Sequence, residues 1–270
     1  MNTEMLALWA GIALYTLAGS IAMSAVVLRH RPESAILALI VLGLAVHGIA
    51  IGLRWERLGH GPFITMFEVL SSNVWSLTAI FALAYWRLPS VRPMAAIVMP
   101  VLFVMMFWLA FENPGAMQLP PTYHTSLLYI HVGFGKVFLG SVLIAVGLGG
   151  VVLARLSKRG AVWFARLPGD VQLDELAFRF LALGFIFETL MLIVGAIWAQ
   201  DAWGRWWAWD PLETWAFLTW LLLAFTLHLR FTLKPAPRVG AALAIGVFVL
   251  AFLTFFGVPF VATAPHQGVI

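Results

Sequence analysis

Cysteine is absent from all 270 residues, and charged residues are scarce, at 10% of the chain. Without thiols the chain can form no disulfide, no Cys-x-x-Cys redox pair and no thiolate metal site, which leaves histidine as the expected ligand for any bound metal. A soluble domain carries about 25% charged residues, and far fewer are available here to cover a water-facing surface. The 62% of hydrophobic residues therefore indicates a protein whose solvent is lipid.

The hydrophobic residues are gathered into eight runs, each close to the roughly 20 helical residues that cross a bilayer. Because helices satisfy their backbone groups internally, these runs predict an all-α, polytopic membrane helix bundle, which we expect to be a single domain over residues 1–270. The first apolar segment has Glu4 directly before the run and lacks a basic leader, so we expect a retained helix and not a signal peptide. The runs lie at 5–28, 35–53, 63–86, 93–111, 125–154, 176–199, 212–233 and 239–262.

Lysine and arginine are distributed unevenly over the two sides of these runs. One side has only Arg54, Arg57 and Arg205. The positive-inside rule puts the richer side in the cytoplasm, so both termini and the Trp-rich connection after the sixth run are predicted to lie outside. The richer side has Arg29, Arg31, Arg87, Arg92, Arg155, Lys158, Arg159, Arg166, Arg179, Arg230, Lys234 and Arg238.

Tryptophan is concentrated in that connection. An aromatic belt at the membrane interface would account for two or three tryptophans, but a cluster this dense indicates a further role. A flat aromatic surface at an interface suits a large planar ligand that is half apolar and half charged. Arg205 is then either the cation for a ligand carboxylate or a simple interfacial anchor. Seven of the 13 tryptophans lie in or beside this connection, between 198 and 220: Trp198, Trp203, Trp206, Trp207, Trp209, Trp215 and Trp220.

The same segment contains a helix start. Asp210 is a preferred N-cap residue, Pro211 fits the first helical position, and Glu213 follows at the third. This Asp-x-x-Glu pattern is related to the capping box and predicts that the seventh run begins here. Asp210 and Glu213 are therefore either caps alone or caps that also face the ligand.

The segment WGRWWAWDPLETWAFLTW, 203–220, resembles the WWD signature of the haem-handling membrane proteins of cytochrome c maturation, most closely the CcsA-like assembly proteins. The blocks at 54–75, 227–231 and 255–266 also resemble that family, although Ile64-Thr65-Met66 departs from its common Leu-Ser-Asn. The resemblance covers nearly the whole chain. It implies a haem-binding WWD loop at about 200–215 formed by Trp203, Trp206, Trp207, Trp209, Arg205 and Asp210.

The resemblance also implies two histidines on the outer side that ligate haem iron, and these correspond to His131 and His266. Neutral imidazole is a standard haem ligand, and the run boundaries put both residues at the level of the Trp-rich loop. Two alternatives stay open. Either histidine could be a plain interfacial residue, and His124 could replace His131 as the ligand.

His228 lies near the cytoplasmic end of the seventh run, and by resemblance it ligates a second haem inside the membrane. Otherwise it is a histidine packed between helices. Its opposite ligand is either His47 or a histidine of a partner chain. Counted from the cytoplasmic ends of their runs, His47 lies at a depth of about 18 Å and His228 at about 8 Å, which favours the partner.

Three further charged residues stand out inside the runs: Glu68, Lys136 and Glu188. Buried charges in lipid must be paired or face a cavity, so we expect ion pairs between helices, with a polar route behind the outer haem site as the alternative. His30 and His60 lie in connections. His30 is expected to have no special role, and His60 is expected either to be structural or to line the rim of the site.

The family resemblance implies a function in haem delivery. The chain would be the membrane subunit of a System II cytochrome c synthase in the bacterial cytoplasmic membrane, moving haem b to the outer WWD site for thioether attachment to an apocytochrome c bearing Cys-x-x-Cys-His. A CcsB/ResB-like membrane subunit is the implied partner, with no nucleic acid. No strong nucleophile stands out, which fits a reaction that the cofactor and the substrate thiols carry out. The alternatives are a CcmC-like haem chaperone or exporter without ligation activity, and an accessory haem-binding protein.

Overall fold

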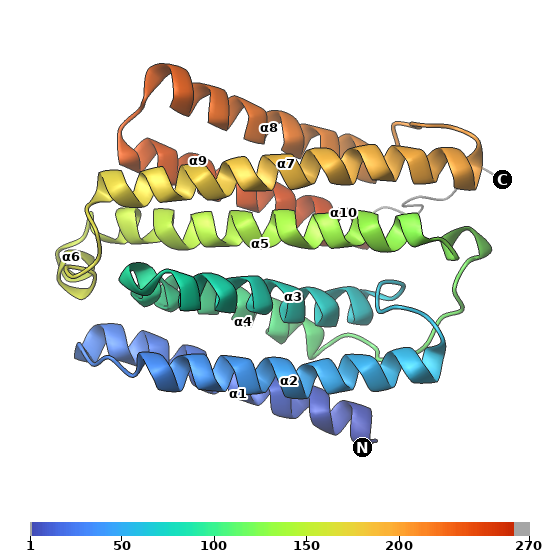
Figure 1. Ribbon diagram of the computed structural model, residues 1–270, viewed down its shortest axis with the longest axis horizontal. Coiled ribbons are helices and arrows are strands. Elements are labelled where there is room, and N and C mark those ends of the chain that lie inside the picture. Colours follow the sequence, from blue (N-terminus) through green and yellow to red (C-terminus); the bar gives the residue numbers. More distant parts are fainter. Residues whose placement is uncertain (1, 262–270) are drawn as a thin grey trace. The chain divides into compact units, whose positions relative to one another are not determined.

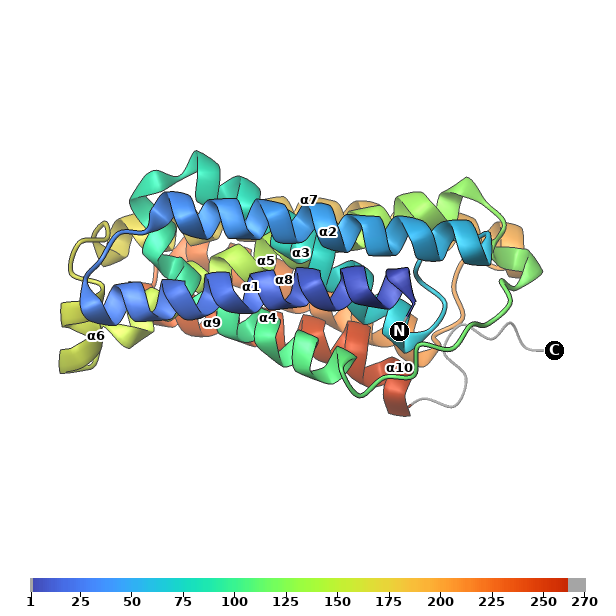
Figure 2. The ribbon, with the colours of Figure 1, turned by 90° about the horizontal axis from the view of Figure 1, so that it is seen from below.

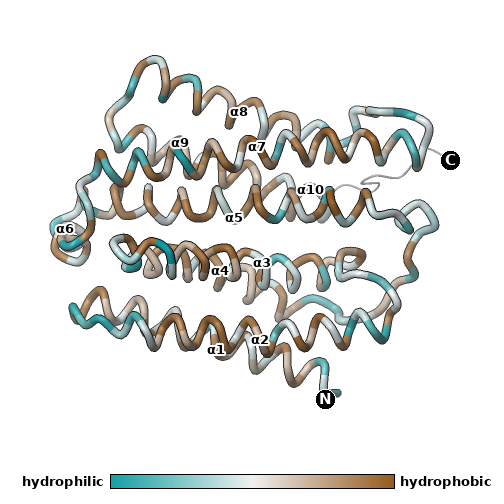
Figure 3. The backbone as a smooth tube through the Cα atoms, viewed as in Figure 1, coloured by the Kyte–Doolittle hydropathy of each residue, from teal (hydrophilic) through white to brown (hydrophobic). Residues whose placement is uncertain are grey.

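The computed structural model describes residues 2–261, which lie mostly in helices and contain no β-strand. Eight described helices are long and apolar enough to cross a membrane, which confirms the all-α, polytopic membrane bundle. Figure 3 shows hydrophobic residues along the helices and hydrophilic residues largely at their ends and connections. The chain is therefore a multi-pass membrane protein.

The chain divides into two compact units, residues 1–119 with 154–168, and residues 120–153 with 169–270. Each unit is described by itself below. The single domain expected over residues 1–270 stays a prediction.

The first unit contains four candidate spans and a short connecting helix. In α1 and α2, which lie side by side in Figure 2, glycines allow close approach. A Cβ on Gly11 would lie 2.8 Å from the His47 Cβ, and one on Gly43 would lie 2.6 Å from the Tyr15 ring. The elements are α1 (Thr3–Leu28), α2 (Glu33–Leu58), α3 (Met66–Arg87), η1 (Pro89–Met94) continuing into α4 (Ala95–Leu109), and α6 (Lys158–Trp163).

The second unit also contains four candidate spans, drawn in Figure 1 from green to red. Helix α5 packs against α7, where Gly184 faces Val142, and against α9, where a Cβ on Gly149 would lie 3.1 Å from the Ala241 Cα. The elements are η2 (Pro121–Tyr123), α5 (Ser126–Ala154, its last residue in the first unit), α7 (Asp170–Trp203), α8 (Pro211–Leu233), α9 (Pro237–Phe252), the π-helical η3 (Leu253–Gly257) and α10 (Val258–Val261).

Helices α2 and α7 extend several residues beyond the runs predicted from the sequence. Helix α2 continues to Leu58, so Arg54 and Arg57 lie on the helix and not in the connection after it. Helix α7 has 34 residues, against the predicted run of 176–199, and ends where Gly204 adopts a left-handed conformation with φ of 70°. Hydropathy marks the apolar centre of a span, whereas helical hydrogen bonding continues into the polar flanks until a residue such as glycine ends it.

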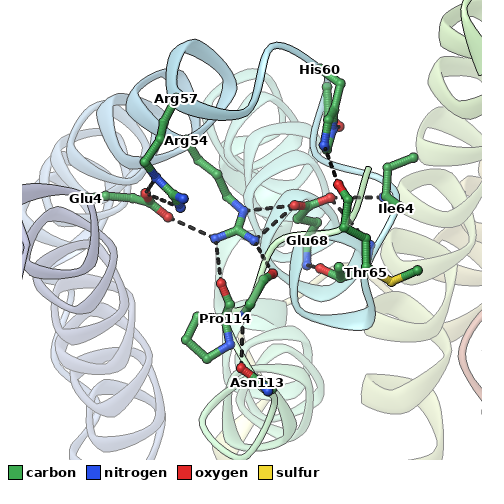
Figure 4. A network of polar contacts seen from close by, with 12 residues as sticks. Glu4, Arg54, Arg57, His60, Ile64, Thr65, Glu68, Asn113 and Pro114 are labelled. Atoms are coloured by element: carbon green, nitrogen blue, oxygen red, sulfur yellow. Dashed lines mark hydrogen bonds and ion pairs between the residues drawn. The ribbon is translucent and has the colours of Figure 1, made fainter. Parts of the chain in front are cut away.

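Arg54 is the centre of a buried polar network at one end of the first unit (Figure 4). Its guanidinium forms ion pairs with Glu4 of α1 at 3.0 Å and with Glu68 of α3 at 2.9 Å. It also donates hydrogen bonds to the carbonyl oxygens of Pro114 and Gly115, at 3.1 and 2.9 Å. One side chain of α2 thus connects α1, α3 and the segment after α4. The expected interhelical pairing is found for Glu68.

Glu68 has a second role at the start of α3. Its backbone N–H donates to the Thr65 hydroxyl, while its carboxylate accepts from the backbone N–H groups of Thr65 and Ile64. This capping box satisfies donors that the first turn of a helix leaves open. His60, in the connection before α3, is buried with its ring nitrogens 2.9 and 3.2 Å from the carbonyl oxygens of Gly61 and Met117, in agreement with a structural role.

Candidate functional site

The candidate site lies at the end of the second unit where α5 begins, α7 ends and α8 begins. Figure 1 shows the connection from α7 to α8, residues 204–210, at the same end as the segment before α5. Most of the residues that the sequence singled out come from these segments. The site therefore combines parts of the chain that are about 70 residues apart in sequence.

His131 is held in a defined orientation on the first turns of α5. Its Nδ1 lies 2.9 Å from the backbone carbonyl oxygen of Met191 in α7. A carbonyl can only accept, so this bond fixes the proton on Nδ1 and leaves the imidazole lone pair on Nε2. Iron-ligating histidines are commonly oriented in this way by a carbonyl that accepts from the other ring nitrogen.

Trp198 is the centre of the aromatic contacts around His131. It is buried, with 3% of its surface exposed, and its indole N–H donates to the carbonyl oxygen of Thr122 at 3.0 Å. Its ring centroid lies 5.1 Å from those of Tyr123 and Trp203, and 6.1 Å from that of His131. Trp198 therefore fixes the segment before α5 against the end of α7.

The tryptophans at 203–209 differ in their exposure. Trp206 and Trp209 are 59% and 66% exposed, whereas Trp203 and Trp207 are partly covered by other rings. Trp209 has a φ of 59°, an uncommon left-handed conformation for a residue other than glycine, and such strain is frequent at functional sites. Two large aromatic side chains thus remain open at this end of the unit.

One polar group in this connection lacks a partner. The indole N–H of Trp207 is enclosed but donates to no atom within the described residues. Arg205 directly precedes Trp206 and Trp207 in the chain. It is partly exposed and forms no ion pair with any of residues 2–261. The connection therefore offers one neutral donor and one cation to an incoming acceptor.

Asp210 and Glu213 form the predicted cap at the start of α8. The Glu213 backbone N–H donates to the Asp210 carboxylate at 2.8 Å, and Pro211 takes the first helical position. The Glu213 carboxylate accepts from the Ala208 N–H at 2.7 Å, two residues before the N-cap that a capping box would use. Burial, and then the charge of Asp210, raise the pKa of Tyr123 above its usual value. Both carboxylates thus hold the connection in place. The charge of Asp210 also affects the pKa of Tyr123 in η2.

His124, the alternative to His131, is exposed, and its side chain makes no hydrogen bond to any residue in 2–261. It lies just after η2, and nothing in its surroundings fixes the orientation of its ring. His131 is the better-oriented of the two candidate ligands.

His228 and His47 have opposite surroundings and lie in different units. His228 is exposed on α8, on a stripe that also exposes Leu218, Leu221 and Phe225. The alternative of a histidine packed between helices does not hold for it. His47 is fully buried, with its Nε2 2.9 Å from the Ser71 hydroxyl and its ring 5.9 Å from that of Tyr15.

Glu188 is fully buried in α7, and neither of its carboxylate oxygens has a hydrogen-bond partner among residues 2–261. The expected interhelical pairing is therefore wrong for this residue. An acidic residue on an apolar span does not indicate by itself which other helix will approach it with a polar group.

Comparison with known proteins agrees with the motifs. Residues 33–266 match the family described as "Cytochrome C assembly protein". The chain belongs to the cytochrome c assembly family. It is 30% identical to the "Cytochrome c biogenesis protein CcsA" of Prochlorococcus marinus subsp. pastoris, over 95% of this chain and 90% of that protein. It is also 30% identical to the protein of the same description from Chlamydomonas reinhardtii, over 80% of this chain and 63% of that one.

The fold has a solved counterpart. A structure of "Cytochrome c Heme Lyase CcmF" matches with a TM-score of 0.72 at 18% sequence identity, over 95% of this chain and 47% of that one. At this identity the likeness shows the fold alone. This member of the cytochrome c assembly family thus spans about half the length of that chain.

One candidate ligand of this assembly protein, His266, lies outside the described residues. The sequence also did not identify every residue of the site. Trp198 was counted in the cluster but not expected to organise it, and Tyr123 was not singled out. Both lie in or beside proline- and tryptophan-rich segments, but their contacts join residues 75 or 76 positions apart, which no local pattern reveals.

Proposed function

We propose that this protein is the membrane subunit of a cytochrome c synthase that presents haem b at the 204–210 connection for attachment to apocytochrome c. The observation that carries the proposal is the His131 Nδ1–H bond to the Met191 carbonyl, which directs the iron-binding lone pair to Nε2. Haem is the substrate of the reaction and not a permanent cofactor.

The donor set of this end of the unit fits a haem. Trp206 and Trp209 offer exposed aromatic surface to the porphyrin plane. Arg205 supplies a cation for a propionate, and the unpartnered Trp207 N–H supplies a hydrogen-bond donor. A ligand with an apolar plane, two carboxylates and a metal centre would use all four groups together with His131.

The residues have separate roles in the proposed mechanism. His131, with His266 as the opposite ligand inferred from sequence, holds the iron six-coordinate and limits its reaction with oxygen. The tryptophans and Arg205 fix the rotation of the ring, so that both vinyl groups meet the substrate cysteines, and Asp210 and Trp203 hold the connection in shape. Such positioning lowers the entropic part of the barrier.

The bond-forming chemistry belongs to the two substrates. Each cysteine thiol of the apocytochrome adds across one vinyl group, with sulfur bonding to one carbon and hydrogen to the other, so that no further reactant is consumed. The substrate histidine then replaces one of the two protein histidines on the iron. This chain needs no nucleophile for these steps.

We propose His228 as a ligand of a second, inner haem that enters from the cytoplasmic side. Its exposure on an apolar stripe of α8 supports this role, because a histidine directed to lipid alone is unfavourable. A CcsB/ResB-like membrane subunit would cover the stripe and contribute the opposite ligand. His47 is the less suitable opposite ligand because its Nε2 already faces Ser71.

The test is to purify the protein with its membrane partner and record its absorption spectrum. His131→Ala should lose most of the haem, and added imidazole should restore it. His124→Ala is the matched control and should bind haem like the wild type. Unchanged haem content in His131→Ala would contradict the proposal.

Co-expression with an apocytochrome separates ligation from transport. The proposed function requires covalent haem on the acceptor, detected by haem staining after denaturation. Haem binding without any thioether product would favour a chaperone or exporter. For the inner site, His228→Ala should lower haem content, whereas His30→Ala, another exposed histidine, should not.

A further inference from the structure

One face of helix α7 lies against α5 along a stripe that includes Gly184, Met191, Gly195 and Trp198. Its members alternate in steps of three and four residues, which places them on one face of a helix. Contacts place Gly184 against Val142, Met191 against Gly135, and Gly195 against His131. The part of the stripe from Met191 to Trp198 forms the surface on which the His131 ring lies.

Gly195 is in direct contact with that ring. A Cβ at this position would lie 2.8 Å from Nδ1 of His131 and 2.9 Å from its Cε1, closer than real Cβ atoms approach other heavy atoms. The ring has little room to yield, because Nδ1 is bonded to the Met191 carbonyl and the Trp198 ring lies alongside it. Any side chain at this position would therefore move the imidazole and lengthen its hydrogen bond.

We propose that Gly195 is a positioning residue for haem ligation: its bare Cα lets the His131 ring lie against α7, where the Met191 carbonyl selects the tautomer that ligates through Nε2. The inference rests on the proposed function, since it takes His131 as an iron ligand. It adds a residue 64 positions away that never contacts the haem. Outer contacts of this kind orient the ligand and raise its basicity.

The first experiment substitutes Gly195→Ala in the protein purified with its partner. The expected result is a weaker low-spin bis-histidine spectrum and a roughly 10- to 100-fold loss of haem affinity, the usual consequence of removing an outer contact. Added imidazole should restore the spectrum. The matched control is Gly246→Ala in α9, where a new Cβ would have no atom within 4 Å, and this variant should bind haem like the wild type.

A double variant separates positioning from general damage to the helix packing. In His131→Ala supplied with imidazole, adding Gly195→Ala should cause no further loss, because the free imidazole is not tethered to α5 and can shift away from the new methyl group. An equal loss in both backgrounds would overturn the proposal, and so would wild-type affinity in Gly195→Ala alone. Retention of haem by His131→Ala would instead contradict the proposed function. Failure of the proposed function can therefore be told apart from failure of the Gly195 proposal.

A measurement on the unaltered protein keeps the inference testable if Gly195→Ala fails to fold. The measurement is an NMR spectrum of the reduced, diamagnetic haem complex with ¹⁵N-labelled histidine. The His131 signal is identified as the one that disappears in His131→Ala, and it should show a proton on Nδ1. A proton on Nε2 would overturn the proposal.

Discussion

Buried acidic residues have opposite surroundings at two places in the chain, one in each unit. In the first unit Glu4 and Glu68 share Arg54, and the guanidinium also reaches two backbone carbonyls. In the second unit Glu188 is equally buried, yet neither oxygen has a partner within residues 2–261. The Trp207 N–H in the same unit is also unpartnered.

This difference separates a satisfied polar network from a buried group without a partner. Leaving a buried polar group unpaired is unfavourable, so such groups are few in folded proteins and need a specific reason. The Arg54 network satisfies its members and joins three helices, which is a structural role. Unpaired groups occur in both units, at Tyr15, His47 and Thr78 in the first and at Glu188 and Trp207 in the second. Glu188 and Trp207 share their unit with His131 and the exposed Trp206 and Trp209.

The largest effect should come from Arg54→Leu. This change leaves Glu4 and Glu68 buried without their shared cation, which should lower the free energy of unfolding by about 3–5 kcal/mol. Unfolding in a detergent titration measures it. Arg57→Leu is the control, because the Arg57 side chain is 46% exposed and, among residues 2–261, forms an ion pair with Glu4 alone. Equal stability of the two variants would remove the basis for calling Arg54 the centre of the network.

Replacing Glu188 should change the free energy of unfolding in the opposite direction. Glu188→Met removes an unsatisfied buried carboxyl and should raise the free energy of unfolding by about 1–3 kcal/mol. Glu68→Met, the same change in the satisfied network, should lower it. If both changes had the same sign in the same titration, the contrast between the units would be wrong.

Trp198→Phe tests the hydrogen bond that joins α7 to the segment before α5. The ring contacts are largely kept, but the donor to the Thr122 carbonyl is lost, so a decrease of about 1 kcal/mol is expected. Haem content should decrease with it, because Trp198 lies beside His131. Wild-type thermal stability would show that this bond contributes nothing.

The smallest effect on stability is expected for Trp206→Ala. This side chain is mostly exposed, and surface changes usually shift stability by less than about 0.5 kcal/mol. Haem affinity should nonetheless fall, as measured by titration of the purified complex. Loss of stability without loss of affinity would assign Trp206 to the scaffold.

Features that depend on neighbouring residues could be predicted from the sequence. The eight spans follow from hydropathy, and the start of α8 follows from Asp210, Pro211 and Glu213. Asp210 and Glu213 also show the limit of such patterns, because the acceptor role of Glu213 toward Ala208 was not anticipated.

Features that depend on distant residues could not be predicted. Arg54 was expected in a connection and instead pairs with Glu4, 50 positions away. Gly195 and Met191 contact His131 across more than 55 residues, and nothing near any of the three indicates it. Family resemblance could name His131 as a ligand, but only the packing of α5 on α7 shows how its ring is held.

The length of α7 has a consequence for where the protein can work. Its 34 residues span about 51 Å, roughly 20 Å more than the hydrocarbon layer of a bilayer. The excess must be taken up by tilt or by projection into the headgroup region, and the balance depends on lipid chain length. Trp198 and Trp203 lie on the final turns of this helix. Membrane thickness therefore sets how far the site stands from the lipid, and under the proposed function haem transfer to a soluble acceptor should slow in bilayers of longer-chain lipids.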